Sequence, residues 1–310
     1  MRARVYKSTG SWYTVKTESG EFCLARIKGI FKIDGITSTN PIAVGDWVKL
    51  EPEAGGEEDG LMITGIDTRY NYINRQSPAN KHQHHILASN LDQSLLLATL
   101  KDPKTSQGFI DRFLVAGEAY HIPSIIVFNK ADIYRKKEMD LFASRKDMYE
   151  SVGYRVLLMS LENKTGMEDV EDILRNKTTL LSGHSGVGKS SFINAVVPGI
   201  LLKTQGVSGW SGKGIHTTTF AEMYDLPLLH AHIIDTPGIR EFGLVDIPKQ
   251  ELSHYFPEMR SRLSGCQFNN CLHVNEPGCA IKKALDEGKI SLDRYVSYCM
   301  MLDSIQEKTY

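Results

Sequence analysis

The segment Gly183 to Ser190, with the sequence GHSGVGKS, constrains the fold of this chain more than any other stretch of it. It matches the pattern G-x-x-x-x-G-K-[ST] in full, follows the apolar pair 180–181 and precedes the helix-like run 191–195. A strand, a glycine-rich loop and a helix in this order predict a phosphate-binding loop, because the glycines allow backbone N–H groups to approach phosphate oxygens. A glycine-rich turn that merely contains a lysine is the weaker interpretation in this context.

The side chains of this loop have distinct expected roles. Lys189 is expected to reach the β- and γ-phosphates of a nucleotide, and the Ser190 hydroxyl is expected to bind Mg²⁺. The predicted nucleotide contacts along the segment are Gly183, His184, Ser185, Gly186, Val187, Gly188, Lys189, Ser190 and Ser191.

A second motif, Asp235-Thr236-Pro237-Gly238, directly follows the apolar run 233–234. Asp235, at the tip of a strand, can hold Mg²⁺ through water, and Gly238 can offer its N–H group to a γ-phosphate. The pattern D-x-x-G is weak alone, because Asp and Gly are common turn residues. Its position after an apolar strand and downstream of a phosphate loop favours the functional interpretation.

The segment 212–219 lies between these two motifs and is rich in glycine and threonine, as is typical of a mobile switch loop. We expect Thr218 to close over Mg²⁺ and the γ-phosphate and to take part in catalysis, with Thr217 as the alternative. Thr219 is as readily explained as the entry into a β-strand.

The motif Asn129-Lys130-Ala131-Asp132 follows the strand-like run 125–128 and predicts a reader of guanine. The Asp132 carboxylate can accept hydrogen bonds from guanine N1–H and the exocyclic 2-amino group together. Adenine has neither donor and would leave the carboxylate unpaired. Lys130 can lay its aliphatic stem over the base plane. A helix cap is the simpler explanation of Asn and Asp, but beside a phosphate loop it is less favoured.

These motifs occur in an unusual order along the chain. In an ordinary small GTPase the guanine reader follows the phosphate loop, whereas here Asn129 precedes Gly183 and no second N-K-x-D occurs after Gly238. Ser160 and Leu161, after the apolar run 156–159, fit the loop that contacts guanine O6 through backbone N–H groups. Chain order does not matter to a site built from loops at one edge of a sheet. We therefore expect a circular permutation.

The cysteines gather near the C-terminus. Three of the five, Cys266, Cys271 and Cys279, form the pattern C-x4-C-x-H-x5-C with His273. Three thiolates and one imidazole make a closed four-ligand set suited to structural zinc. Unpaired structural cysteines are the alternative, but the surrounding loops offer little core to bury them.

The remaining sequence predicts how these motifs are arranged in domains. Residues 1–75 carry short β-type runs at 12–15, 21–25, 46–50 and 62–64, which suit a small barrel of the oligonucleotide/oligosaccharide-binding (OB) type. An acidic, glycine-rich stretch at 51–60 predicts a hairpin loop, and the polar residues 75–90 predict a linker. Beyond residue 91, apolar runs alternate with helix-like stretches such as 110–120 and 137–151, which predicts a parallel sheet covered on both faces. A final helix is expected from Ile281 to about Lys308.

The predicted fold is therefore multi-domain α/β. It comprises an OB-type barrel in residues 1–75, a circularly permuted P-loop GTPase domain with a mostly parallel sheet in 76–245, and a zinc-binding module with a helix in 246–310.

Composition limits the environment and the partners. The 310-residue chain has a net charge of −1, so any nucleic-acid contact must come from a local patch. The basic first 50 residues carry such a patch with interspersed aromatic side chains, although most of these aromatics are expected to fill the barrel core. No apolar run approaches the roughly 18 residues of a membrane span. We expect a cytoplasmic, monomeric protein without membrane contact.

The combination of guanine reader, phosphate loop and D-T-P-G in permuted order, between a small β-barrel and C-x4-C-x-H-x5-C, resembles the RsgA (YjeQ/YloQ) family of ribosome small-subunit-dependent GTPases. The resemblance covers nearly the whole chain. It implies a factor that binds the small (30S) ribosomal subunit late in maturation and hydrolyses GTP slowly unless the subunit stimulates it. It also implies rRNA contact by the barrel and the zinc module. A switch histidine implicated in hydrolysis would be His216 here.

The function expected is thus GTP hydrolysis coupled to maturation of the small subunit. Ile239 follows D-x-x-G where Ras-type enzymes place a water-orienting glutamine, which predicts slow turnover by the protein alone. Two alternatives remain at this point. One is a non-catalytic switch in which GTP sets RNA affinity, and the other is a permuted GTPase acting on the large subunit.

Overall fold

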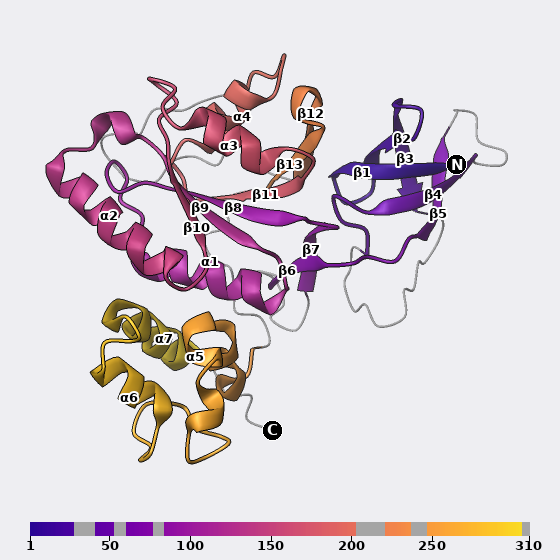
Figure 1. Ribbon diagram of the computed structural model, residues 1–310. Coiled ribbons are helices and arrows are strands. Elements are labelled where there is room, and N and C mark those ends of the chain that lie inside the picture. Colours follow the sequence, from indigo (N-terminus) through magenta and orange to yellow (C-terminus); the bar gives the residue numbers. More distant parts are fainter. Residues whose placement is uncertain (28–40, 53–59, 77–83, 203–220, 237–246, 306–310) are drawn as a thin grey trace.

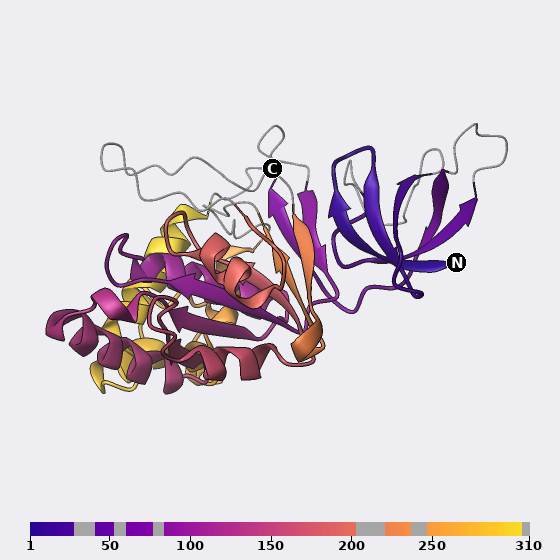
Figure 2. The same ribbon diagram turned by 90° about the horizontal axis from the view of Figure 1, so that it is seen from above.

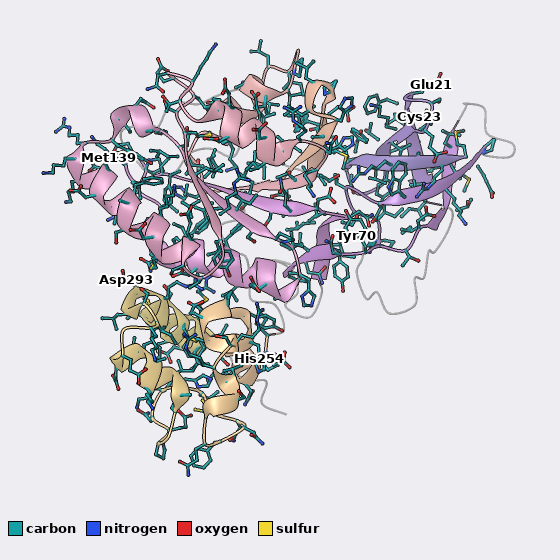
Figure 3. The ribbon with its side chains drawn as sticks, viewed as in Figure 1. Glu21, Cys23, Tyr70, Met139, His254 and Asp293 are labelled. Atoms are coloured by element: carbon teal, nitrogen blue, oxygen red, sulfur yellow. The ribbon has the colours of Figure 1, made fainter. Side chains whose placement is uncertain are left out.

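The computed structural model describes residues 1–27, 41–52, 60–76, 84–202, 221–236 and 247–305. It has three parts (Figure 1): an N-terminal barrel, a central sheet domain and a helical C-terminal module. Figure 3 shows Glu21 and Cys23 of the barrel and Met139 of the sheet domain at opposite ends of the molecule.

The N-terminal part is a closed five-stranded barrel. Its strands are β1 (Arg2–Ser8), β2 (Tyr13–Thr17), β3 (Phe22–Ile27), β4 (Trp47–Pro52) and β5 (Leu61–Ile66). They follow the order β1-β2-β3-β5-β4, and β4 returns to pair with β1, which closes the barrel in the OB arrangement that the sequence predicted. Because β4 and β5 pair antiparallel, the acidic stretch between them connects a hairpin, although residues 53–59 lie outside the described residues.

The barrel core is aliphatic rather than aromatic. It contains Val5, Val15 and Leu50, and Tyr13 is the one tryptophan, tyrosine or phenylalanine of its described core. The expectation that most N-terminal aromatics fill the core was therefore wrong. Trp12 and Phe22 are 45% and 57% exposed because they lie on the outward side of their segments.

The central sheet has the order β10-β9-β8-β11-β13-β12, with all neighbours parallel except β12. Its strands are β8 (Gln93–Ala98), β9 (Ser124–Phe128), β10 (Arg155–Leu158), β11 (Thr178–Ser182), β12 (Glu222–Leu226) and β13 (Ala231–Asp235). The two middle strands, β8 and β11, are buried at every position, as expected for strands covered on both faces.

Helices cover both faces of this sheet. α1 (Gln107–Ala119) and α2 (Lys136–Glu150) pack on one face, where Phe113 and Phe142 meet Phe128 of β9. α3 (Met167–Leu174) and α4 (Lys189–Val196) pack on the other, where Val170 and Phe192 share a core with Val127. The predicted helices at 110–120 and 137–151 are confirmed within a few residues. A short 3-10 turn, Ala131–Ile133, follows β9.

A hairpin stands between the barrel and the central sheet (Figure 2). β6 (Tyr72–Gln76) and β7 (His84–Ser89) pair antiparallel, so the prediction that 75–90 is only a linker was wrong. The buried Asp46 carboxylate fixes the barrel to this hairpin, because it accepts hydrogen bonds from Arg69 at 2.5 and 2.6 Å and from Ser89 Oγ at 2.5 Å.

The barrel also extends the central sheet. β1 pairs with β12 at Lys7 and Glu222, whose side chains form an ion pair of 3.0 Å. Beside them, Asp225 of β12 accepts hydrogen bonds from Tyr6 Oη (2.6 Å) and Lys16 Nζ (2.5 Å). Although burial opposes it, these and a hydrogen bond with His232 hold the pKa of Asp225 well below its usual range. Polar contacts therefore dominate this junction.

The C-terminal module is built from short helices. They are the 3-10 helices Lys249–Tyr255 and Leu263–Gly265, α5 (Pro257–Arg260), α6 (Ala280–Asp286) and α7 (Leu292–Ser304). The single helix predicted from Ile281 to about Lys308 is therefore two helices. The helical conformation is interrupted at Gly288, which adopts the left-handed backbone with φ +69° that favours glycine. Lys308 lies outside the described residues.

The module packs against α1 through a buried ion cluster. Arg294 of α7 is fully buried and donates to Glu258 at 2.7 and 3.2 Å and to Asp111 of α1 at 2.7 Å. Tyr149 of α2 also donates to Asp111, at 2.9 Å. Figure 3 places Asp293, the neighbour of Arg294, on the side of the module that faces the sheet domain. None of the helices within the described ranges is long and apolar enough to cross a membrane.

Candidate nucleotide site and metal centre

Four predicted segments meet at one edge of the central sheet. Asn129 follows β9, Ser160 follows β10, Gly183 follows β11, and Asp235 ends β13. These strands run parallel, so their carboxyl ends lie side by side. This is the edge at which open α/β sheets bind ligands. The permuted chain order therefore still brings the four segments to the same edge of the sheet.

The phosphate loop joins β11 to α4 as the sequence predicted. Gly183 has φ +147°, and a Cβ atom there would lie 2.4 Å from Leu97 O, so only glycine fits. Lys189 Nζ donates to the carbonyl oxygens of Gly183 and His184, which hold the ammonium group inside the loop. Burial lowers the pKa of Lys189, while the Asp235 charge raises it. Ser185, Gly186 and Ser191 are exposed, Val187 is buried, and Ser190 is half-buried.

The His184 ring leans away from the loop towards the segment before α1. Its Nε2 lies 2.7 Å from Thr105 Oγ1, and its Nδ1 lies 3.0 Å from Ser185 O. The ring also meets Phe109 edge-on, with 5.6 Å between centroids. Burial lowers the pKa of His184; the hydrogen bond with Ser185 raises it, and the charges of Lys189 and Lys130 lower it.

The predicted guanine-reading segment, residues 129–132, is held by contacts on both sides. Lys130 has a left-handed backbone with φ +67°, and its Nζ donates to Asp102 O. The exposed Asp132 carboxylate accepts a hydrogen bond from Ser160 Oγ at 2.5 Å, and Ala131 N donates to Met159 O at 3.1 Å. The two loops predicted to surround the base are thus joined to each other.

The phosphate loop and the guanine-reading segment are in direct contact. Asn129 Nδ2 donates to Val187 O at 2.9 Å. A Cβ atom at Gly188 would lie 2.6 Å from the same Nδ2 and 4.0 Å from Leu161, so glycine is needed for this approach. In the described part of the chain, Asn129 Oδ1 and Thr236 Oγ1 are buried without a hydrogen-bond partner. Buried polar atoms without a partner are expected where a bound ligand supplies the missing hydrogen bonds.

Some predicted residues lie outside the described residues. These are His216, Thr217 and Thr218 of the switch segment, and Gly238 with Ile239.

Two residues that contact the candidate site were not predicted from the sequence. The Tyr134 hydroxyl donates to Asn129 O at 2.6 Å and accepts from Leu100 N at 2.8 Å, which fixes the start of the guanine-reading segment. Thr105 contacts His184. Tyr134 follows the N-K-x-D motif by two residues, which was an available signal, whereas nothing in the sequence marks Thr105.

The four predicted metal ligands come together in the C-terminal module. The ligand atoms of Cys266, Cys271, His273 and Cys279 all lie within 4.8 Å of one another and could hold a metal ion. His273 Nδ1 lies 3.6 Å from Cys266 Sγ and 3.4 Å from Cys279 Sγ. A tetrahedral zinc ion with the usual Zn–S and Zn–N bond lengths requires about 3.5 Å between such atoms. The donor set therefore fits a closed tetrahedral site.

The loop that carries these ligands is fixed by its neighbours. Glu276 accepts hydrogen bonds from the backbone N–H groups of Leu272 and Val274, both at 2.9 Å. Tyr295 and Tyr298 of α7 donate to the carbonyl oxygens of His273 and Leu272, at 2.7 and 2.8 Å. Contacts of this kind orient ligands before a metal binds.

Comparison with known proteins agrees with this architecture. The family model of the RsgA GTPase matches residues 66–245, and that of the RsgA N-terminal domain matches residues 3–60. A protein of Flavobacterium psychrophilum named small ribosomal subunit biogenesis GTPase RsgA is 50% identical over 310 residues, which cover 100% of this chain and 94% of that protein. A Bacteroides fragilis protein of the same name is 46% identical, with 100% and 99% covered.

Two solved structures share the fold. The crystal structure of YjeQ from Thermotoga maritima has a TM-score of 0.77 at 30% identity and covers 98% of this chain and 97% of that one. YloQ, described as a circularly permuted GTPase, has a TM-score of 0.74 at 29% identity, with 100% and 96% covered. The match to the GTPase family model spans more than half of the chain, and the curated relatives align over its whole length. The chain is thus a circularly permuted GTPase that belongs to the RsgA family.

Proposed function

We propose that this protein couples GTP hydrolysis to late maturation of the small (30S) ribosomal subunit. The observation that carries the proposal is the meeting of the phosphate loop with the guanine-reading segment through Asn129 and Val187, in a chain whose relatives are named for biogenesis of that subunit. The test is GTP turnover with and without purified small subunits. Negligible turnover both with and without small subunits would instead support a non-catalytic, GTP-dependent RNA-binding switch. Stimulation by large subunits alone would support a permuted GTPase that acts on the large subunit.

The residues of the site have separate roles in this proposal. Asp132 pairs with the guanine edge, and Ser160 holds its carboxylate in position. Lys189 stabilises the charge that develops on the β- and γ-phosphates, and the N–H groups of the loop add to it. Ser190 and Thr218 would hold Mg²⁺, with Asp235 acting through water. When bound there, the ion would supply positive charge that offsets the negative charge of the nucleotide phosphates.

The proposal includes finer assignments. Zinc occupies the Cys266, Cys271, His273 and Cys279 site, where it is structural because the four protein ligands leave no open position.

We place the domain boundaries near residues 75 and 245. The protein acts in the cytoplasm as a monomer.

Contact with rRNA is assigned to the barrel and the C-terminal module. The barrel offers exposed Trp12 and Phe22 for base stacking, with cations close to both rings. Arg26 lies 6.0 Å from the Trp12 ring, and Lys16 lies 5.3 Å from the Phe22 ring. Aromatic faces beside basic side chains suit single-stranded nucleic acid.

Substitution of the guanine reader provides the first test of the site. Asp132→Asn replaces one acceptor oxygen by a donor, so GTP binding is expected to weaken by about 1.5–3 kcal/mol, or roughly 10- to 150-fold. Xanthosine triphosphate carries a 2-carbonyl group in place of the amino group and is expected to regain affinity for the variant. Asp140→Asn, an exposed carboxylate on α2, is the matched control. Unchanged GTP affinity in Asp132→Asn would exclude Asp132 as the base reader.

Substitution of the switch histidine tests hydrolysis. Ile239 cannot orient water, so the protein alone is expected to turn over GTP slowly, and small subunits are expected to raise the rate by ordering the switch segment. His216→Ala is expected to bind GTP normally and to lose most of the stimulated rate. Single-turnover hydrolysis with purified subunits measures this. Fast hydrolysis by the protein alone, or full stimulation of the variant, would contradict the mechanism.

A further inference from the structure

The contact between His184 and Thr105 joins two parts of the chain that the GTPase motifs do not connect. His184 is the second residue of the phosphate loop, and Thr105 lies in the segment between β8 and α1. Thr105 is fully buried and fixed on several sides. Its backbone N–H donates to Thr99 O at 2.8 Å, and its Oγ1 accepts from Thr99 N at 2.9 Å.

The hydrogen-bond partners favour one arrangement of protons on the His184 ring. The Ser185 carbonyl can only accept, so His184 Nδ1 carries a proton and donates to it. Thr105 Oγ1 already accepts from Thr99 N, so its own proton is available to His184 Nε2 at 2.7 Å. These partners favour a neutral imidazole that is protonated at Nδ1 and accepts at Nε2, and burial, which lowers the pKa of His184, favours the same form.

This arrangement fixes the orientation of a peptide group inside the phosphate loop. Because a trans peptide is planar, its C=O and N–H groups point in opposite directions. The His184 ring holds the Ser185 carbonyl on its own side, which turns the Gly186 N–H to the opposite side. The backbone carbonyl of His184 also accepts from Lys189 Nζ, at 3.3 Å. The ring thus orients a loop N–H group, and its residue supplies the longer of the two carbonyl contacts made by Lys189.

We infer that His184 is a positioning residue of the nucleotide site, which presents the Gly186 N–H group and Lys189 to the phosphates and is itself held by the Thr105 hydroxyl. The inference rests on the proposed binding of guanine nucleotide at this loop. His184 acts through the backbone and Lys189 and makes no bond to the reacting atoms.

Nucleotide affinity in a double-mutant cycle provides the test. GDP binding is measured with a fluorescent GDP analogue in the full-length wild type, His184→Ala, Thr105→Val and the double variant. Each single substitution is expected to weaken binding about tenfold, since each removes one or two hydrogen bonds that order the loop. The double variant is expected to bind no more weakly than His184→Ala. Thr105→Ser keeps the hydroxyl and is expected to retain the wild-type affinity.

A spectroscopic measurement keeps the inference testable if Thr105→Val folds poorly, because that variant also leaves Thr99 N without its acceptor. In ¹⁵N-histidine NMR spectra, the signal that His184→Ala removes is expected to show a protonated Nδ1 and an unprotonated Nε2. A proton on Nε2, additive losses in the double variant, or unchanged affinity of His184→Ala would overturn the inference. Failure of the wild type to bind any guanine nucleotide would instead refute the proposed function.

Discussion

Removal of the metal is expected to unfold the C-terminal module and to leave the barrel and the central sheet folded. The ligands lie in a loop-rich segment, and two of them, Cys271 and Cys279, belong to the hydrophobic core of the module, so metal binding is expected to supply much of the free energy that folds it. The purified protein is expected to hold one equivalent of zinc. Cys271→Ser is expected to lower that content and to expose the amide groups of α6 and α7 to hydrogen exchange.

A matched variant separates loss of the metal from loss of a cysteine. Cys299 lies in the same module, is half-buried and is not among the four ligands, so Cys299→Ser is expected to keep the metal. Mass spectrometry under native conditions measures the zinc content, and hydrogen exchange of α7 measures the stability of the module. Full protection of α7 after complete chelation would show that the metal does not stabilise the module.

The second large effect is expected at the buried ion cluster between the module and α1. Arg294→Met removes the cation that pairs with the buried carboxylates of Glu258 and Asp111, and leaves Asp111 with the neutral Tyr149 hydroxyl as a donor. Loss of one partner from a buried ion pair typically costs about 3–5 kcal/mol. Native-state hydrogen exchange of α7 is expected to show an opening free energy lower by this amount.

An exposed ion pair across the same interface is the control. Arg260 donates to Glu118 of α1 at 2.8 Å, but its side chain is 52% exposed. Exposed pairs contribute about 0–1 kcal/mol, so Arg260→Ala is expected to change the opening free energy little. Equal effects of Arg260→Ala and Arg294→Met would show that the cluster does not hold the module in place.

The sequence predicted the parts of the fold that depend on local pattern. Strands β8 and β9 were found as continuous apolar runs, because both of their faces are covered by helices. In contrast, β1 (RARVYKS) and β12 (EMYDL) were missed. Both carry charged side chains, since they meet at the polar junction between the barrel and the central sheet.

The candidate site also has features that a local sequence pattern predicts and features that it does not. The phosphate loop and the guanine reader are recognisable because chemistry fixes their residue types and spacing. Contacts between residues that are distant in the sequence cannot be recognised from such patterns. Thr105 and His184 are 79 positions apart, and Asp111 and Arg294 are 183 positions apart. The break between α6 and α7 was also missed. A glycine in a helix-like run is often tolerated. Here Gly288 follows the C-cap of α6 in the left-handed conformation, which ends the helix.

The C-terminal module is joined to the central domain by the chain and also by contacts with α1. In the chain it follows β13, which ends at Asp235, and Arg294 and Arg260 contact α1. If the ion cluster opened, the covalent tether would keep the module near its docking surface at an effective concentration on the order of millimolar. Undocking would then be reversible and independent of protein concentration. A partner could displace the module from α1 and release it again without any loss of the module by diffusion.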